Sequence, residues 1–334
     1  MIFFLLAFLL TVLLTPAAMM LANKFDIVDH PNGVLKRHYK STPYLGGIAL
    51  FISVIATALM LKRTEFLDLK HLGLFLGGLI IVCGGLIDDK RALPPGLKMG
   101  VQIAAAICAM YSGLHTNFNA PPGLNSVLTL LWIIGGVNAF NLIDIMDGLA
   151  AGVAALSALF LGVLLLLKGE IFYSSLLFAL SGACLGFLLF NFNPARIFLG
   201  DAGSQFLGYL LFCLAIQWST NETFGHRLFI PLFILAIPLF ETFFVSVMRL
   251  RRRVSPFRGS NDHFALRMVK VGLSIKATVG LTLLCSVTLG LAAILILKYD
   301  AASYYTIGIA LLLVLILFHR LGGIDMTAAR EEKA

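Results

Sequence analysis

Apolar segments of about 18 residues or more recur along almost the whole chain of 334 residues. Each is long enough for a helix to cross the hydrocarbon core of a bilayer, which is roughly 30 Å thick. Hydrophobic residues make up 59% of the chain and charged residues only 13%, whereas soluble domains are about 25% charged. The composition therefore excludes an ordinary soluble enzyme and a disordered chain, and it predicts an all-α, polytopic integral membrane protein.

The spacing of these segments predicts about eleven transmembrane helices, which leave no room for a second soluble domain. Residues 1–320 are expected to form a single transmembrane domain, followed by a short cytoplasmic tail over residues 321–334. The five cysteines all fall inside apolar runs without C-x-x-C spacing, so we interpret them as packing residues. The predicted helices lie near residues 1–22, 45–61, 71–87, 97–113, 126–143, 149–167, 171–190, 203–219, 228–248, 277–297 and 302–319.

The distribution of basic residues predicts the orientation of this bundle. If the first helix starts outside, the inner segments carry 19 of the 25 Lys and Arg residues, as the positive-inside rule requires. This favours an outer N-terminus and an inner C-terminus. The net charge of +8 needs no nucleic-acid partner, because juxtamembrane basic residues meet anionic membrane lipids.

Acidic residues are costly near a membrane, so their positions are informative. Six of seven notable acids fall at the inner ends of predicted helices or in inner loops, and the seventh lies inside the ninth helix. Carboxylates from separate segments at one membrane face are suited to Mg²⁺, which prefers hard oxygen ligands. The seven are Asp88, Asp89, Asp144, Asp147, Asp201, Asp262 and Glu241.

Each acidic group also has a purely structural interpretation. Asp88 and Asp89 could be a solvated helix end beside Lys90 and Arg91, rather than a cation or proton-transfer site. Asp201 precedes an apolar run and is flanked by glycines, so it could cap the next helix as well as bind a ligand.

The pattern N-x-x-N-x-x-D-x-x-D places four polar residues on one face if the segment is helical. They are Asn138, Asn141, Asp144 and Asp147. A polar seam between helices is the structural alternative to a functional site.

Two basic inner loops accompany the acids. The first contains Lys40, and the second contains several arginines together with His263. Most of these charges are expected only to signal topology, although such loops can also hold a pyrophosphate and a lipid phosphate beside Mg²⁺.

Taken together, five segments in order resemble the polyprenyl-phosphate N-acetylhexosamine-1-phosphate transferase family. The eleven predicted helices and the outer N-terminus look more like its bacterial UDP-N-acetylglucosamine–undecaprenyl-phosphate branch than its muramoyl-pentapeptide branch. The segments are DHPNGVLKRHYKSTPYLGG (29–47), GGLIDDKRALPPGLKMGVQ (84–102), NAFNLIDIMDGLAAG (138–152), FNFNPARIFLGDAGSQFLG (190–208) and PLFETFFVSVMRL (238–250).

The resemblance implies a catalytic domain acting at the cytoplasmic face of the bacterial inner membrane. A UDP-amino sugar would give its sugar 1-phosphate to undecaprenyl phosphate with the help of Mg²⁺, releasing UMP and starting an envelope glycan. Direct attack by the acceptor phosphate and a covalent enzyme intermediate both stay open, as does a homodimer.

The resemblance also implies roles for individual residues. Asp201 resembles the Mg²⁺ ligand, and Asp88 resembles the carboxylate that deprotonates or positions the acceptor phosphate, with Asp89 beside it. Asp144, Asp147 and His263 are the further catalytic candidates. The candidate substrate-binding residues are Lys40, Asn138, Asn141, Arg196 and Phe198.

The chain departs from the family pattern in three places. The last large inner loop offers only His263 where several histidines are common, Glu241 replaces a frequent Asp, and Ile145-Met146 stands where a Gly is frequent. These departures bear on the identity of the donor sugar.

Two other classes of membrane protein share part of this pattern. CDP-alcohol phosphatidyltransferases also contain D-x-x-D-G, but the Ala-Arg pair and the later D-x-x-x-D of their pattern are missing here. An ion-coupled transporter would use the carboxylates as a cation site, yet it predicts acids near the bilayer midplane rather than at one edge.

Overall fold

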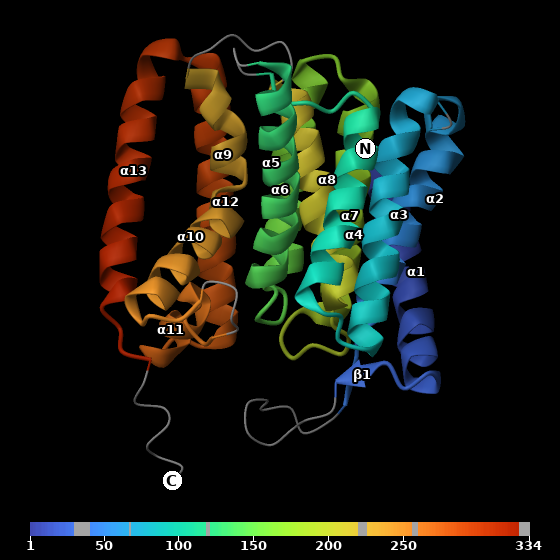
Figure 1. Ribbon diagram of the computed structural model, residues 1–334, viewed down its shortest axis with the longest axis horizontal. Coiled ribbons are helices and arrows are strands. Elements are labelled where there is room, and N and C mark those ends of the chain that lie inside the picture. Colours follow the sequence, from blue (N-terminus) through green and yellow to red (C-terminus); the bar gives the residue numbers. More distant parts are fainter. Residues whose placement is uncertain (30–40, 67, 118–120, 220–225, 256–259, 327–334) are drawn as a thin grey trace. The chain divides into compact units, whose positions relative to one another are not determined.

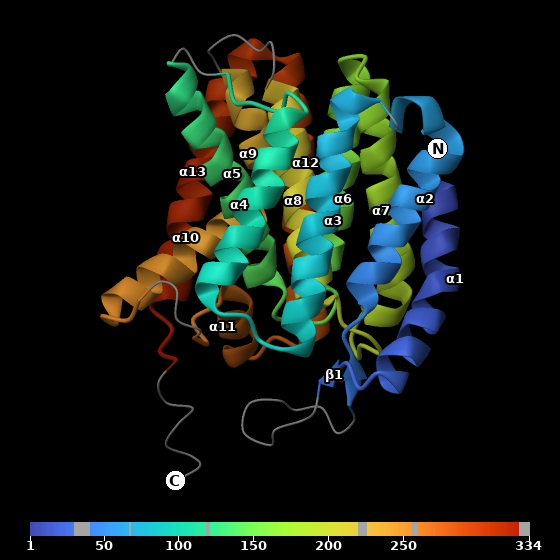
Figure 2. The same cartoon turned by 45° about the vertical axis from the view of Figure 1, so that its right-hand side comes forward.

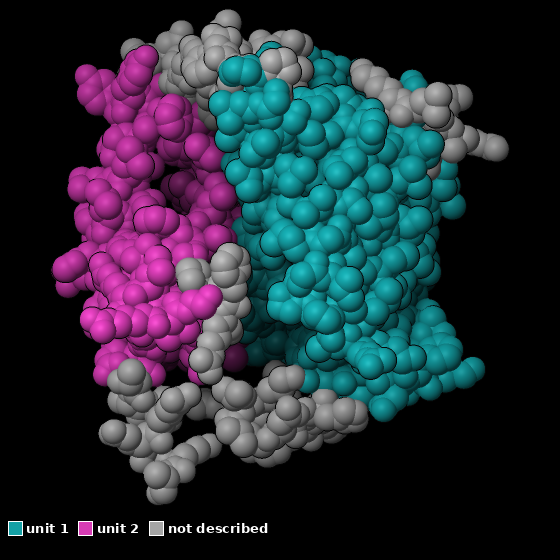
Figure 3. All heavy atoms as spheres, viewed as in Figure 1, with its two compact units in different colours: residues 1–223 teal, residues 224–334 magenta. Residues whose placement is uncertain are grey.

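The computed structural model describes residues 1–29, 41–66, 68–117, 121–219, 226–255 and 260–326. The chain divides into two compact units, residues 1–223 and 224–334, which Figure 3 distinguishes by colour and which are described separately below. The single domain over residues 1–320 stays a prediction.

Helices dominate both units (Figure 1). Within the described residues, seven of them are long and apolar enough to cross a membrane, which confirms an all-α polytopic membrane protein. The first unit contains α1 (Ile2–Lys24), β1 (Val28–Asp29), β2 (Thr42–Pro43), α2 (Gly46–Phe66), α3 (Leu69–Lys90), α4 (Pro95–Tyr111), α5 (Pro122–Ile143), α6 (Leu149–Leu167), α7 (Ile171–Asn191) and α8 (Gly200–Ser219). The second contains the 3₁₀ turn η1 (His226–Phe229), α9 (Ile230–Ile234), α10 (Ala236–Arg251), α11 (Phe264–Lys270), α12 (Ile275–Lys298) and α13 (Asp300–Gly322).

The ninth predicted helix, residues 228–248, is wrong as a single helix. The chain instead forms η1, α9 and α10, with a break at Leu235. Pro238 accounts for the break, because its ring clashes with the carbonyl four residues earlier and it has no N–H to donate. The other ten predicted segments each correspond to one helix.

Helix α8 forms the centre of the first unit. Of its 20 residues, 17 are buried, and it contacts α2, α3, α5 and α6. Small residues allow these close approaches, as is common between membrane helices. A Cβ added to Gly208 would lie 2.3 Å from the carbonyl oxygen of Gly136 on α5, and one added to Gly47 would lie 2.2 Å from the backbone nitrogen of Gly203.

A short antiparallel ribbon closes one end of the first unit, where β1 is labelled in Figures 1 and 2. Val28 of β1 pairs with Pro43 of β2. The Phe198 N–H donates to the Pro43 carbonyl (2.8 Å), and the Gly46 N–H donates back to the Phe198 carbonyl (3.0 Å). These bonds fix the start of α2 against the segment that leads into α8.

The close approach of α2 to α8 gives a testable prediction. Gly47→Ala should lower the free energy of unfolding by about 1–3 kcal/mol, because the added methyl group overpacks a backbone contact that cannot yield. The measurement is thermal unfolding of the purified protein in detergent, followed by tryptophan fluorescence. Gly135→Ala is the matched control, since a Cβ there meets nothing within 4 Å and alanine favours a helix. Equal melting temperatures for the two variants would contradict the prediction.

Candidate active site

A cavity of about 660 Å³ opens at the ribbon end of the first unit. Six carboxylates and a single lysine stand among its lining residues, so its charge is strongly negative. The lining residues are Asp29, Tyr44, Asp88, Asp89, Ala92, Lys98, Asp144, Ile145, Met146, Asp147, Asn191, Phe198, Gly200 and Asp201. The structure thus brings together all five aspartates that the sequence singled out in the motifs at 88–89, 144–147 and 201.

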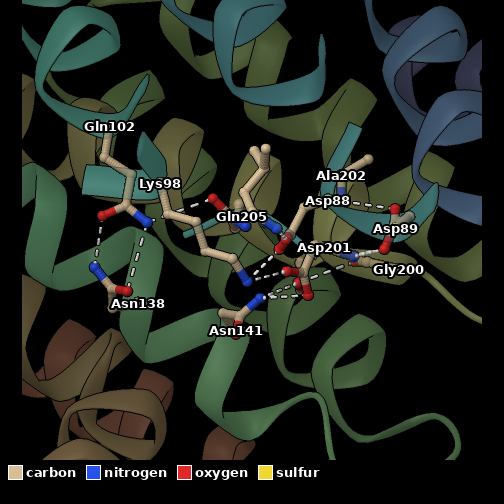
Figure 4. A network of polar contacts seen from close by, with 12 residues as sticks. Asp88, Asp89, Lys98, Gln102, Asn138, Asn141, Gly200, Asp201, Ala202 and Gln205 are labelled. Atoms are coloured by element: carbon tan, nitrogen blue, oxygen red, sulfur yellow. Dashed lines mark hydrogen bonds and ion pairs between the residues drawn. The ribbon is translucent and has the colours of Figure 1, made fainter. Parts of the chain in front are cut away.

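Lys98 lies between two of these acids (Figure 4). Its ammonium group forms an ion pair with Asp88 and lies 3.3 Å from Oδ2 of Asp201. Asp88 ends α3, where its Oδ1 also accepts the Leu93 N–H at 2.7 Å. The cation therefore joins the end of α3 to the first turn of α8 and offsets part of the repulsion between two carboxylates.

Asp89, the next residue on α3, caps α8 from outside that helix. Its two carboxylate oxygens accept the N–H groups of Asp201 (2.7 Å) and Ala202 (3.2 Å). These are among the N–H groups that a helix start cannot satisfy internally. Gly200 permits this contact, since it has a φ of +70° and a Cβ there would lie 2.5 Å from Oδ2 of Asp89. The cap that the sequence analysis ascribed to Asp201 is thus supplied by Asp89.

Asp201 is consequently free to direct its side chain into the cavity. Its Oδ1 accepts the Asn141 amide of α5 at 3.0 Å, and the same amide lies 3.2 Å from the Ser204 hydroxyl. Asn141 therefore holds the Asp201 carboxylate, while Asp89 holds the Asp201 backbone.

Asp144 and Asp147 lie in the connection between α5 and α6, because α5 ends at Ile143 and α6 begins at Leu149. The structure agrees with the predicted helix ends at 143 and 149, so the common face, expected only for a helical segment, does not include this pair. Oδ2 of Asp147 accepts the Asn193 amide (2.9 Å) and the Ala195 N–H (3.0 Å). Asp147 thus fastens the segment before α8 to the segment after α5.

Asp144 differs from its neighbours in having no hydrogen bond within the described part of the chain. Burial, together with the nearby carboxylates of Asp201, Asp89 and Asp147, raises the pKa of Asp144 to about 8. The side chain therefore changes charge near neutral pH.

Asn138 lies one helical turn before Asn141 and outside the cavity lining. Its amide donates to Gln102 of α4 (2.8 Å) and to the Ile134 carbonyl (2.8 Å). Gln102 in turn donates to Gln205 of α8 (3.4 Å). Here the geometry matches the structural alternative, a polar seam between helices (Figure 4), and a substrate contact for Asn138 stays a prediction.

Two aromatic residues, Phe198 and Tyr44, line the cavity. Their ring centroids lie 5.7 Å apart at an angle of 47°. Burial, followed by the charge of Asp29, raises the pKa of Tyr44 above its usual range. Exposed Arg196 is not among the lining residues and lies over the Phe190 ring. Lys40, the other predicted binding residue, lies outside the described residues.

His263 belongs to the second unit, so its position relative to the cavity is not defined. Its Nδ1 lies 2.6 Å from Oε1 of Glu241, and both side chains are buried. The neighbouring Asp262 pairs with Arg252 (2.9 Å) and Arg267 (3.0 Å).

Sequence reasoning missed Lys98 and Tyr44. Lys98 was counted only as one of the inner positive charges, although its place in the first turn after Pro94-Pro95 put it close to the aspartate pair. Tyr44 was quoted within a motif without a role. Its position in the wall depends on the pairing of β1 with β2, which no local pattern indicated.

The residues of the cavity fit a magnesium ion. No three His, Cys, Asp or Glu side chains form a ready-made cage in the described ranges, but Mg²⁺ commonly takes one or two protein carboxylates and fills its other positions with water and phosphate. Asp201 and Asp144 offer hard oxygen ligands at this wall. The excess of negative charge around them favours a cation.

The raised pKa of Asp144 predicts a protonation change that infrared spectroscopy can detect. In protein freed of divalent cations, a protonated carboxyl band should disappear as the pH rises through about 8. Asp144→Asn should lack this transition, because the amide is isosteric but does not titrate. Asp68→Asn, an exposed site away from the cavity, should keep it. A transition near pH 4, the ordinary range of an aspartate, would contradict the prediction.

Comparison with known proteins places the chain among transferases. Residues 71–219, which span α3 to α8, match the model of glycosyl transferase family 4. The chain is 32% identical over 302 residues to a Bacillus subtilis protein named "Probable undecaprenyl-phosphate N-acetylglucosaminyl 1-phosphate transferase", covering 88% of this chain and 84% of the relative. It is 27% identical over 283 residues to the undecaprenyl-phosphate alpha-N-acetylglucosaminyl 1-phosphate transferase of Escherichia coli K12 (80% and 76%). It is also 27% identical over 309 residues to a Mycobacterium tuberculosis decaprenyl-phosphate N-acetylglucosaminephosphotransferase (82% and 76%). The chain therefore belongs to glycosyl transferase family 4 and, as its motifs indicated, to the polyprenyl-phosphate N-acetylhexosamine-1-phosphate transferases.

Proposed function

We propose that this protein transfers N-acetylglucosamine 1-phosphate from UDP-N-acetylglucosamine to undecaprenyl phosphate. A bond forms between an oxygen of the acceptor phosphate and the sugar-bearing phosphorus, the bond from that phosphorus to UMP breaks, and UMP leaves. Family membership and the names of the relatives support this reaction over the transporter alternative. The structural observation that most supports this reaction is the cavity in which the acids of three sequence motifs lie together.

The charge of the cavity supports a requirement for Mg²⁺. Both proposed substrates bear phosphate groups, and six lining carboxylates would repel them. When bound, Mg²⁺ would offset this repulsion and stabilise the charge that develops on the departing UMP. Asp201 is the proposed metal ligand, with Asp144 as the second oxygen donor at the same wall.

The remaining groups would position the two substrates. Asp88 is the proposed partner of the acceptor phosphate, either accepting its proton or orienting it, and Lys98 keeps Asp88 in place. Phe198 and Tyr44 offer two aromatic rings, tilted by 47° to each other, against which the uracil ring can pack. Holding two reactants in line is a large part of what a phosphoryl-transfer site contributes.

Other residues would act by holding these groups still. Asp89 fixes the backbone of Asp201, Asn141 fixes its side chain, and Asp147 fixes the loop after α5. Lys40 and Arg196 are proposed to contact substrate phosphates.

The proposal includes the location of the reaction. The apolar segments support about eleven spans, and the distribution of basic residues supports an outer N-terminus and an inner C-terminus. With bacterial relatives, this favours the cytoplasmic membrane of a bacterium and a site that faces the cytoplasm. A homodimer is compatible with it.

The first experiment tests the reaction. Purified protein is mixed with Mg²⁺, undecaprenyl phosphate and, in turn, UDP-N-acetylglucosamine, UDP-N-acetylgalactosamine or UDP-glucose, and UMP release is followed. We expect release with UDP-N-acetylglucosamine and a lipid product that carries the sugar. EDTA should stop the reaction, and added Mg²⁺ should restore it. Folded protein that releases no UMP with any donor would overturn the proposed function.

The second experiment tests Asp201. Asp201→Asn should reduce UMP release by at least about 10–100-fold, the loss typical even of outer-shell metal partners, and should raise the Mg²⁺ concentration that gives half the maximal rate. Asp68→Asn, which makes the same chemical change outside the cavity, should retain both values. Unchanged Mg²⁺ dependence in the Asp201 variant would remove Asp201 from the metal site.

A further inference from the structure

A buried carboxylate in the second unit is paired with the one histidine of the last inner loop. Glu241 lies in α10 and is 0% exposed. Its Oε1 lies 2.6 Å from Nδ1 of His263, and its Oε2 accepts the Phe264 N–H at 3.2 Å. The two oxygens of one carboxylate therefore face two nitrogens from consecutive residues of another segment.

This geometry places a proton on Nδ1 of His263. The Phe264 N–H can only donate, so Oε2 of Glu241 acts as an acceptor. Among the residues described, His263 is the only basic side chain paired with Glu241. Two lone pairs cannot face one another at 2.6 Å, so a proton lies between Oε1 and Nδ1, and the short distance fits a charge-assisted bond in which Nδ1 donates.

The other ring nitrogen is then left for a ligand. Within the described ranges, Nε2 has no hydrogen-bond partner in the protein, and it is not among the polar atoms sealed from solvent. In the neutral ring, a proton on Nδ1 makes Nε2 an acceptor.

The backbone on either side of His263 is also fixed. Asp262 is held by Arg252 and Arg267, and Arg267 donates to the carbonyls of Leu321 (2.9 Å) and Ile324 (2.6 Å) near the end of α13. Phe264 is held by Glu241. A side chain supported in this way is pre-organised rather than free to turn.

We infer that Glu241 is a positioning residue that holds His263 with its proton on Nδ1 and keeps Nε2 available as a proton acceptor. The inference rests on the proposed function, to which it adds His263 as a group that accepts a proton during the reaction. Glu241 would touch neither substrate and would act only through the imidazole.

Nuclear magnetic resonance tests the tautomer without using activity. The full-length protein, labelled with ¹⁵N-histidine, is compared with His263→Asn to assign the ring signals. We expect the Nδ1-protonated form in the wild type and a mixture of tautomers in Glu241→Gln, because an amide cannot accept both N–H groups. Glu241→Asp keeps the carboxylate and should restore the wild-type form more fully than Gln. Thr242→Val, on the next residue of α10, should leave the signals unchanged. The same tautomer in wild type and Glu241→Gln would overturn the inference.

A double-mutant cycle tests whether Glu241 acts through His263. UMP release is measured for Glu241→Gln, His263→Ala and the double variant, each checked for folding by size-exclusion chromatography. Glu241→Gln should lower kcat at least about tenfold with little change in KM, and should add less than about twofold in the His263→Ala background. If Glu241→Gln lowered kcat by the same factor with His263 present and with His263→Ala, Glu241 would have only a structural role. Absence of turnover in the wild type would defeat the proposed function, while the tautomer measurement would still decide the pairing.

Discussion

The site of this protein depends on how the first turn of α8 is satisfied. A helix that starts inside a membrane protein has backbone N–H groups that water cannot easily reach, and leaving them unpaired is costly. Asp89 supplies the acceptors from the end of α3. This contact leaves the Asp201 side chain free of capping, so that Asn141 and Lys98 orient it instead. One cap thus determines which aspartate holds the helix and which is available for chemistry.

The aspartates of the cavity consequently have different environments despite similar sequence contexts. Asp89 and Asp147 have backbone N–H partners and stabilise the junctions before and after the cavity. Asp88 is balanced by Lys98, whereas the half-buried side chain of Asp144 has no hydrogen bond in the described part and has a raised pKa. The partners of each carboxylate depend on which helix end or loop lies next to it. Carboxylates with backbone N–H partners stabilise the site, whereas those without such partners are suited to binding a cation or exchanging a proton.

Most of the helices were predictable from sequence because the length of an apolar run and the cost of exposing backbone in lipid leave few alternatives. The acids of the site were predictable for a related reason, since carboxylates in an apolar chain are conspicuous. The partners of each acid were not. The pairing of Asp89 with α8 and of Lys98 with Asp201 joins residues about one hundred positions apart, and only tertiary packing brings them together. The break at Leu235 could have been found from Pro238, whereas the non-helical path at Asp144 agrees with the predicted helix ends at residues 143 and 149.

Helix α3 carries both Asp88 and the cap of the helix that bears Asp201. Two hydrogen bonds accepted by Asp89 and the bridge through Lys98 join the end of α3 to the start of α8. The two helices also pack closely at Gly85, where an added Cβ would lie 2.4 Å from Cα of Ala202. The spacing between Asp88 and Asp201 is therefore fixed by the packing of α3 against α8. A bulky donor must therefore gain room from the other lining segments, the connection between α5 and α6 and the ribbon next to Tyr44.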